Sequence, residues 1–163
     1  MDFKINTYIK PVLLISAIIG AILGLLTLIP VVNFFIIISF GLVGGTTIYI
    51  LKRKILVGIL TLNDGAIIGA ISGFISVLAG SLIYIPLAFI LGQFLSIFSI
   101  GFSMNVSFLV ASFNIFVTFM IVSFLGFLNA IFSAFSGLIV AFVYEKIENN
   151  SKQTEFRIDI TDN

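Results

Sequence analysis

Apolar residues fill most of this chain in two long runs that contain no charged side chain. The first run lies between Lys10 and Lys52, and the second lies between Asp64 and Glu145. Because about 20 apolar residues in a helix cross the hydrocarbon core of a bilayer, runs of this length predict membrane-spanning helices. We therefore predict an all-α integral membrane protein, built as a bundle of four transmembrane helices.

Turn residues and charges divide the two runs into the predicted spans. Pro30 and Asn33 mark a tight turn without charge, and a basic triplet at 52–54 ends the first run. The predicted spans cover about 12–29, 34–51, 65–87 and 119–144, with Pro11 at the first helix start. They form a single transmembrane domain, 12–144, between a cytoplasmic arm at 1–11 and a polar cytoplasmic tail at 145–163. The polar composition of that tail predicts a solvated, mostly disordered end.

The region 88–118 is rich in phenylalanine and serine. Ser96, Ser99 and Ser103 are spaced three and four residues apart, which places them on one face of a helix. We favour an additional membrane-embedded or interfacial segment here, because four full crossings after Asp64 would leave almost no residues for turns. The alternative is a further pair of short spans.

Small residues recur at about every fourth position in the predicted spans. Residues four apart lie on one face of a helix, and helices in a bilayer associate where small residues let their backbones approach closely. The stripe that begins after Asp64 is the longest of these. The predicted helix-packing residues are Gly20, Gly24, Gly41, Gly45, Gly65, Gly69, Gly73, Gly80, Ser133 and Gly137.

The composition removes most catalytic chemistry. The chain has no cysteine and no histidine, and only 9% of its residues are charged, with a net charge of +1. Acid–base catalysis and coupled ion transport need positioned ionisable groups, and residues 65–144 contain no Asp, Glu, Lys or Arg. We therefore predict no enzymatic activity, no cofactor, no metal site and no nucleic-acid partner.

The basic residues predict the orientation of the chain. Lysine and arginine concentrate in cytoplasmic segments, and the turn at 30–33 has neither. This distribution places both termini and the 52–64 loop in the cytoplasm, with the protein in the cell membrane.

Two polar residues are candidates for a polar site. Asp64 stands at the predicted start of the third span, where with Asn63 it most simply caps the helix; the functional alternative is a cation or proton site at the mouth of the bundle. Asn129 lies at membrane depth, where we expect it to form an interhelical hydrogen bond.

A resemblance to a known group of proteins adds topology to this picture. The residues that carry it are Ile29-Pro30-Val31-Val32-Asn33, Gly44-Gly45, Tyr49, Asn63-Asp64-Gly65-Ala66, Gly69 and Gly73. Their order resembles a family of small uncharacterised prokaryotic membrane proteins with a Pro-x-x-Asn turn, a Gly-Gly span and an Asp-Gly-Ala-x-x-Gly span. The similarity covers 12–80 well and 125–144 weakly. Such proteins often carry a charged loop where this chain is apolar, and the resemblance implies no reaction.

These patterns favour a non-enzymatic protein that acts through helix packing. We expect a homo-oligomer or an accessory subunit of a membrane complex, with membrane lipids and other membrane proteins as partners, because the small-residue stripes exceed what four helices need. The alternative is a small channel, permeation subunit or holin-like pore, lined by serines and asparagines of the 92–114 region.

Overall fold

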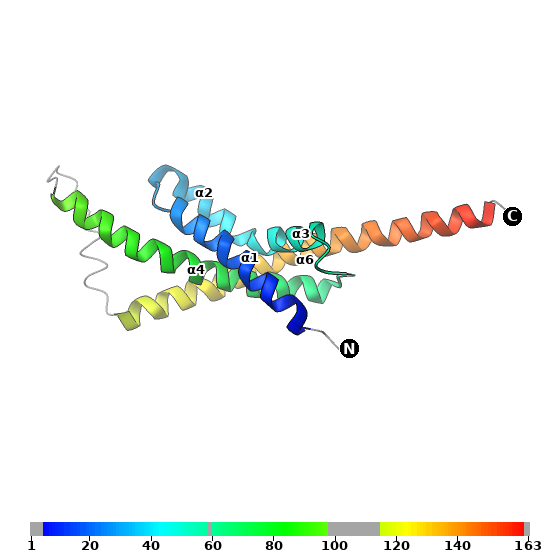
Figure 1. The fold of residues 1–163 in the computed structure, drawn as a ribbon, viewed down its shortest axis with the longest axis horizontal. Helices are drawn as coiled ribbons and strands as arrows, with labels where there is room; N and C mark the ends of the chain where they lie inside the picture. The colour runs from blue at the N-terminus through cyan, green and yellow to red at the C-terminus, as the bar shows by residue number, and fades with distance from the viewer. Residues whose placement is uncertain (1–4, 59, 98–114, 162–163) are drawn as a thin grey trace.

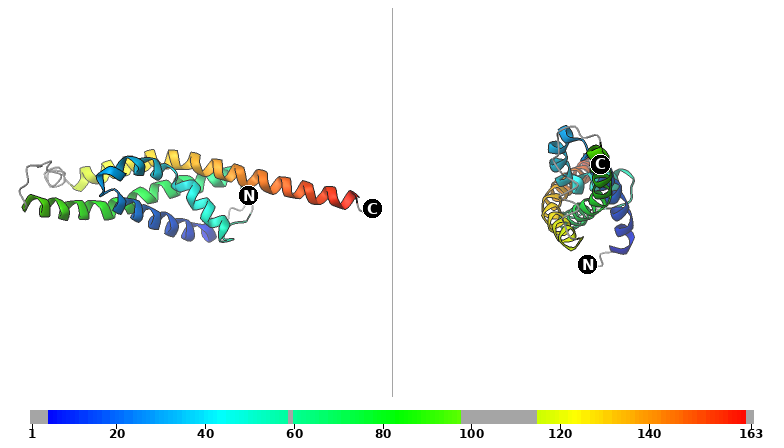
Figure 2. Two further views of the ribbon diagram at one scale, coloured as in Figure 1. Left: turned by 90° about the horizontal axis from the view of Figure 1, so that it is seen from above. Right: turned by 90° about the vertical axis from the view of Figure 1, so that its left-hand side faces the viewer.

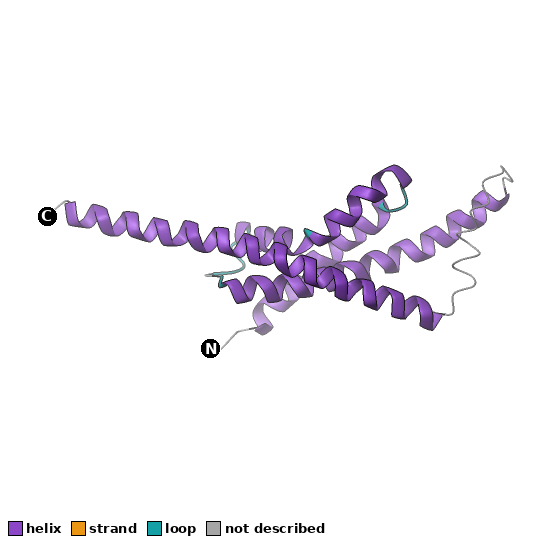
Figure 3. Ribbon diagram, turned by 180° about the vertical axis from the view of Figure 1, so that it is seen from behind, coloured by secondary structure: helices purple, strands orange, loops and turns teal. Residues whose placement is uncertain are grey.

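The computed structural model describes residues 5–58, 60–97 and 115–161, and within these ranges the chain is helical and contains no strand (Figures 1 and 3). The helices are α1 (Ile5–Leu26), α2 (Pro30–Gly41), α3 (Val43–Arg53), α4 (Leu62–Ile97) and α6 (Ile115–Thr161). The predicted all-α class is confirmed for this part of the chain.

Three of the described helices are long and apolar enough to cross a membrane. Their apolar segments are Tyr8–Leu26, Leu62–Leu91 and Val117–Glu148. The outward face of α6 carries large apolar side chains, and Phe124 and Phe127 are 63% and 65% exposed. An apolar surface of this kind is suited to contact with lipid chains. The structure therefore indicates a membrane location.

The central helix of the bundle is α4, and α1 lies along one of its faces. Gly20 of α1 lies against Ser76, and Gly24 lies against Gly80. Both pairs advance in the same direction along the chain, so α1 and α4 run parallel, as the views in Figures 1 and 2 show.

A different face of α4 is covered by α6, which runs in the opposite direction. Gly65, near the start of α4, lies against Gly137, and Gly73 lies against Asn129. Advancing along α4 therefore means going backward along α6. The two long helices cross near the middle of the molecule (Figure 3).

The predicted second span, 34–51, is wrong as a continuous helix, because the chain bends at Leu42 between α2 and α3. Leu42 has φ −87° and ψ −4°, at the edge of the helical region. Beyond the bend, the N–H groups of Gly44 and Gly45 donate to serine side chains of α6. These tertiary hydrogen bonds satisfy donors at the start of α3, which makes a break inside an apolar segment tolerable.

The other helices extend beyond their predicted limits. The third span was expected to end near Pro86, but α4 continues through that residue to Ile97. Proline removes one backbone donor and crowds the preceding turn without necessarily ending a long helix in a membrane. Residues 98–114 lie outside the described residues. The choice between an embedded segment and two short spans at 88–118 therefore stays a prediction.

Both ends of the chain are more helical than expected. α1 begins at Ile5, so Pro11 lies inside the helix and not at its start. The polar tail from 145 continues α6 as far as Thr161 and projects away from the bundle (Figures 1 and 2). The expected disorder is therefore wrong for 145–161, where Glu, Lys, Gln and Arg are good helix formers.

A cluster of buried hydrophobic residues lies at one end of the bundle, where the connection between α3 and α4 packs against the helices. Its members are Val12, Ile48, Leu51, Val57, Leu60 and Ile68. Ile55 of that connection has a positive φ of 55° and is 90% exposed, so its strained turn faces outward.

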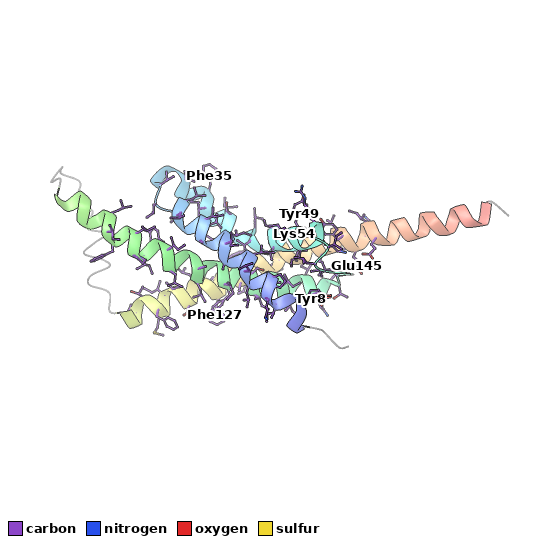
Figure 4. All side chains as sticks on the ribbon, in the orientation of Figure 1. Tyr8, Phe35, Tyr49, Lys54, Phe127 and Glu145 are labelled. Atoms are coloured by element: carbon purple, nitrogen blue, oxygen red, sulfur yellow. The ribbon has the colours of Figure 1, made fainter. Side chains whose placement is uncertain are left out.

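Charged side chains collect at this same end. Lys54, Glu145 and Tyr8 lie toward the same end of the bundle, and Phe35 lies toward the other (Figure 4). Lys52 forms an ion pair with Glu148 of α6, with 3.5 Å between Nζ and Oε2. The bundle thus has one charged end and one apolar end, as the charge pattern of the sequence predicts.

Candidate functional site

The interface between α4 and α6 is built from backbone contact. A Cβ added to Gly69 would lie 2.5 Å from the carbonyl oxygen of Ser133 and 2.9 Å from the Cα of Ala134. A Cβ on Gly137 would lie 3.0 Å from the Cα of Gly69. A Cβ on Gly65 would collide with the Cβ of Ala141, and one on Gly73 would collide with the Cβ of Ser133. The predicted stripe of small residues on α4 therefore packs against α6 of the same chain.

The second small-residue face of α4 receives α1. A Cβ on Gly20 would lie 2.6 Å from the Cα of Ser76, and one on Gly24 would lie 2.8 Å from the Cα of Gly80. A Cβ on Gly80 would in turn lie 2.9 Å from the carbonyl oxygen of Gly20. The predicted packing residues of α1 and α4 thus meet each other.

The start of α3 joins this junction through hydrogen bonds. The Gly44 N–H donates to Ser133 Oγ over 2.7 Å, and the Gly45 N–H donates to Ser136 Oγ over 2.9 Å. Ser133 is fully buried. Two serines of α6 therefore cap a helix that begins inside the apolar part of the bundle, in place of local capping residues.

Loss of these two caps gives a testable expectation. The double variant Ser133→Ala, Ser136→Ala leaves two N–H groups without acceptors, so we expect the free energy of unfolding in detergent to fall by about 2 kcal/mol. Chemical unfolding monitored by circular dichroism measures it. Ser39→Ala is the control, since Ser39 Oγ donates only to Phe35 of its own helix. An equal loss in both variants would contradict the capping role.

The two predicted polar residues have separate structural partners. Asp64 Oδ2 accepts the Thr61 N–H over 3.0 Å, and the Asp64 N–H lies 3.3 Å from Thr61 Oγ1. This reciprocal pair is a capping box at the start of α4. Asp64 was expected to cap the helix from just before its start; it lies instead in the first turn of α4, and Thr61 is the residue that precedes the helix. Asn129 Nδ2 donates to the Gly73 carbonyl oxygen over 2.8 Å, which is the expected interhelical hydrogen bond.

Beside the junction lies an apolar groove between α2, α4 and α6, with Gly24 of α1 also in its lining. Its volume is about 770 Å³. The lining residues are Gly24, Thr27, Ile38, Phe40, Gly41, Leu42, Val77, Gly80, Ser81, Tyr84, Leu125, Leu128, Asn129, Phe132, Phe135, Ser136 and Ile139. None of them carries a formal charge at neutral pH. A concave, mostly apolar surface with a few polar groups is the usual form of a ligand site.

Gly41 differs from the other predicted packing glycines. A Cβ there would meet only the Cβ of Phe132, at 3.5 Å, which is ordinary van der Waals contact. By contrast, Gly45 is closed by Val140 at 3.0 Å and by the Ser136 carbonyl oxygen at 3.1 Å. Gly41 therefore lines the groove and is not a close-packing residue.

Sequence reasoning missed the groove and one of the two capping serines. Ser136 follows Ser133 by three residues, on the same face of a helix, and this spacing was a usable signal. The hydroxyl residues Ser81 and Tyr84 are also three apart. Their spacing did not predict the groove, because a groove forms only where neighbouring helices are separated in the folded structure.

Two further expectations concern a metal site and a pore. The described residues contain no group of three or more His, Cys, Asp or Glu side chains that could hold a metal ion. Of the serines expected to line a pore, Ser99 and Ser103 lie outside the described residues, so the pore stays a prediction.

Comparison with known proteins adds no relative: no family model, no curated protein and no solved structure matches this chain.

Proposed function

We propose that this protein is a non-enzymatic, four-crossing membrane protein that holds an uncharged hydrophobic molecule in its groove, as an accessory subunit within the membrane. The observation that carries the proposal is the groove itself, about 770 Å³ in volume and lined without a formally charged residue. Such a surface can bind a guest by shape and apolar contact. Acid–base chemistry would require positioned ionisable groups there.

The four crossings comprise α1, α2 with α3, α4, and α6. α2 and α3 have 12 and 11 residues, and with Leu42 their combined path is roughly 36 Å at helical rise, which supports one bent crossing of a hydrocarbon core of about 30 Å. The basic residues at the charged end favour an orientation with both termini and the α3–α4 connection in the cytoplasm.

Cysteine labelling tests this topology, because the chain has no cysteine of its own. With Val31→Cys and Arg53→Cys made singly, a membrane-impermeant maleimide should label the two positions from opposite sides of the membrane. The reason is that position 31 begins the crossing made by α2 and α3, and position 53 ends it. Labelling of both from the same side would remove the four-crossing arrangement.

Association with other proteins must use surfaces other than the glycine stripes. The close contacts at Gly20, Gly65, Gly69 and Gly73 are made within one chain. A homo-oligomer built on these stripes would require the bundle to open. We therefore assign the accessory role to the groove and to the outward apolar faces.

The compact photolabel adamantyl diazirine tests the binding role in purified protein. Expected labelling concentrates on groove residues such as Leu128 and Phe132, and Gly41→Leu reduces it roughly tenfold by filling the space, as one overpacked side chain would. Leu82→Phe is the control, because Leu82 is 75% exposed and outside the lining. Labelling spread evenly over outward phenylalanines, unchanged by Gly41→Leu, would refute a guest in the groove.

A further inference from the structure

We infer that the end of α3 binds the head group of an anionic phospholipid at the membrane surface. The residues that carry the inference are Arg53, Lys54 and Ile55, where α3 ends and the connection to α4 begins. This surface is separate from the groove and does not depend on what the groove holds. Three observations support the inference: the strained and exposed position of Ile55, the level at which the connection is held, and the two exposed cations beside it.

Ile55 occupies a backbone position that usually belongs to glycine. Its φ of 55° lies in the left-handed region, which is strained for a β-branched residue. The Leu56 N–H donates to the Leu51 carbonyl oxygen, and the Ile55 N–H donates to that of Lys52, each over 3.0 Å. This is the hydrogen-bond pattern of a Schellman turn, in which glycine is the common residue at the position of Ile55. Yet the isoleucine side chain is 90% exposed, so apolar contact that offsets the strain has to come from outside the chain.

The connection after Ile55 is held at the level of the last turns of α3. Val57 and Leu60 are buried in one cluster with Leu51, so the chain folds back against the bundle and does not project into water. Ile55 is therefore exposed close to where the apolar part of α3 ends. In a bilayer this level corresponds to the boundary between head groups and acyl chains.

Arg53 and Lys54 are available to an external anion. Both side chains are exposed, and neither forms an ion pair within the part of the chain that the structure describes. Lys52, by contrast, pairs with Glu148 of α6 and lies 5.7 Å from the centroid of the Tyr144 ring. The basic triplet thus uses one cation inside the bundle and presents two at its surface.

A phospholipid head group fits these features better than an acidic protein segment does. Basic side chains at a membrane surface attract anionic lipids, and an apolar side chain beside them can enter the boundary of the acyl chains. An acidic peptide would neutralise Arg53 and Lys54 but leave Ile55 without apolar contact. Tyr49 is half exposed and stands four residues before Arg53 on the same face of α3, where a tyrosine ring is suited to the head-group level (Figure 4).

A single-tryptophan variant tests the inference, because the chain has no tryptophan of its own. Ile55→Trp in the purified full chain is reconstituted into vesicles of equal amounts of phosphatidylglycerol and phosphatidylcholine, with bromine on the acyl chains of one lipid or the other. Bromine quenches tryptophan fluorescence only at short range. We expect phosphatidylglycerol to bind at position 55 at least about fivefold more tightly than phosphatidylcholine, as attraction by one or more basic residues would give.

Two comparisons separate a head-group site from general contact with lipid. Adding Arg53→Gln and Lys54→Gln to the reporter variant should abolish the preference for phosphatidylglycerol and retain the quenching. Leu82→Trp is the matched control, because Leu82 is 75% exposed on α4 and lies 18 residues beyond Asp64, far along the helix from the charged end. Both brominated lipids should quench it equally.

The other outcomes overturn the inference. Absence of quenching by either lipid would show that Ile55 faces water, and equal quenching by both would show an apolar contact without a head-group site. Tyr49→Trp reports on the same surface should Ile55→Trp fail to fold. Ile55→Gly should raise the temperature of thermal aggregation in detergent, because glycine adopts this φ without strain. A lower temperature would show that the Ile55 side chain supports the bundle itself. None of these results bears on photolabelling of the groove, so the proposed function stands or fails separately.

Discussion

Replacing Gly69 with leucine will prevent the bundle from forming in its present arrangement. The added side chain would collide with backbone atoms of Ser133 and Ala134, at 2.5 Å and 2.9 Å from its Cβ alone, and neither helix can move without breaking other close contacts. We expect a loss of about 3 kcal/mol or more in the free energy of unfolding. Thermal aggregation of the purified protein in detergent measures the effect.

Ile67→Leu is the matched control for this variant. Ile67 is on the same helix, 46% exposed, and outside the close contacts. Insertion into the membrane should survive both changes, since each segment stays apolar. If Gly69→Leu aggregates at the same temperature as the wild type while Ile67→Leu aggregates at a lower one, the described packing of α4 against α6 is wrong.

Replacing Gly20 with leucine will detach α1 from α4 and leave the rest of the bundle assembled. A Cβ at Gly20 would lie 2.6 Å and 2.7 Å from the Cα and carbonyl carbon of Ser76, so the two helices must separate. The expected loss is about 2 to 3 kcal/mol, and it should be local. Hydrogen exchange should show lost protection in α1 with protection retained across α4 and α6.

The comparison for Gly20→Leu is Ile22→Leu, at an outward position that is 52% exposed. It should leave exchange in α1 unchanged. Loss of protection throughout α6 in Gly20→Leu would show that the two faces of α4 are coupled, and it would contradict a local effect.

Together these variants bear on what the small-residue stripes are for. The stripes of α1 and α4 meet each other, and the longer stripe of α4 meets α6. The close contacts that could have joined separate copies are therefore made within one chain. The groove follows from the same arrangement: α3 is fixed to α6 by Ser133 and Ser136, while the bend at Leu42 directs α2 away and leaves space beside it.

Much of the fold was predictable because its signals are local. The absence of charge between Asp64 and Glu145 determines that this region is apolar enough for a bilayer. The spacing of Gly65, Gly69 and Gly73 determines which face of the helix can approach another backbone. A capping interaction of Asp64 was also predictable, since it involves a residue only three positions away.

The tertiary structure decided the features that depend on distant partners. The sequence specified that Gly44 is small, but the acceptor of its N–H is Ser133, 89 residues away. That bond allows the helix to break at Leu42, inside the single span that the apolar run predicted over 34–51. Gly41 shows the same limit: its small size suggested close packing, yet the bend places it on the groove wall. A periodic pattern defines a face, and only the arrangement of helices determines whether that face meets a backbone or an open groove.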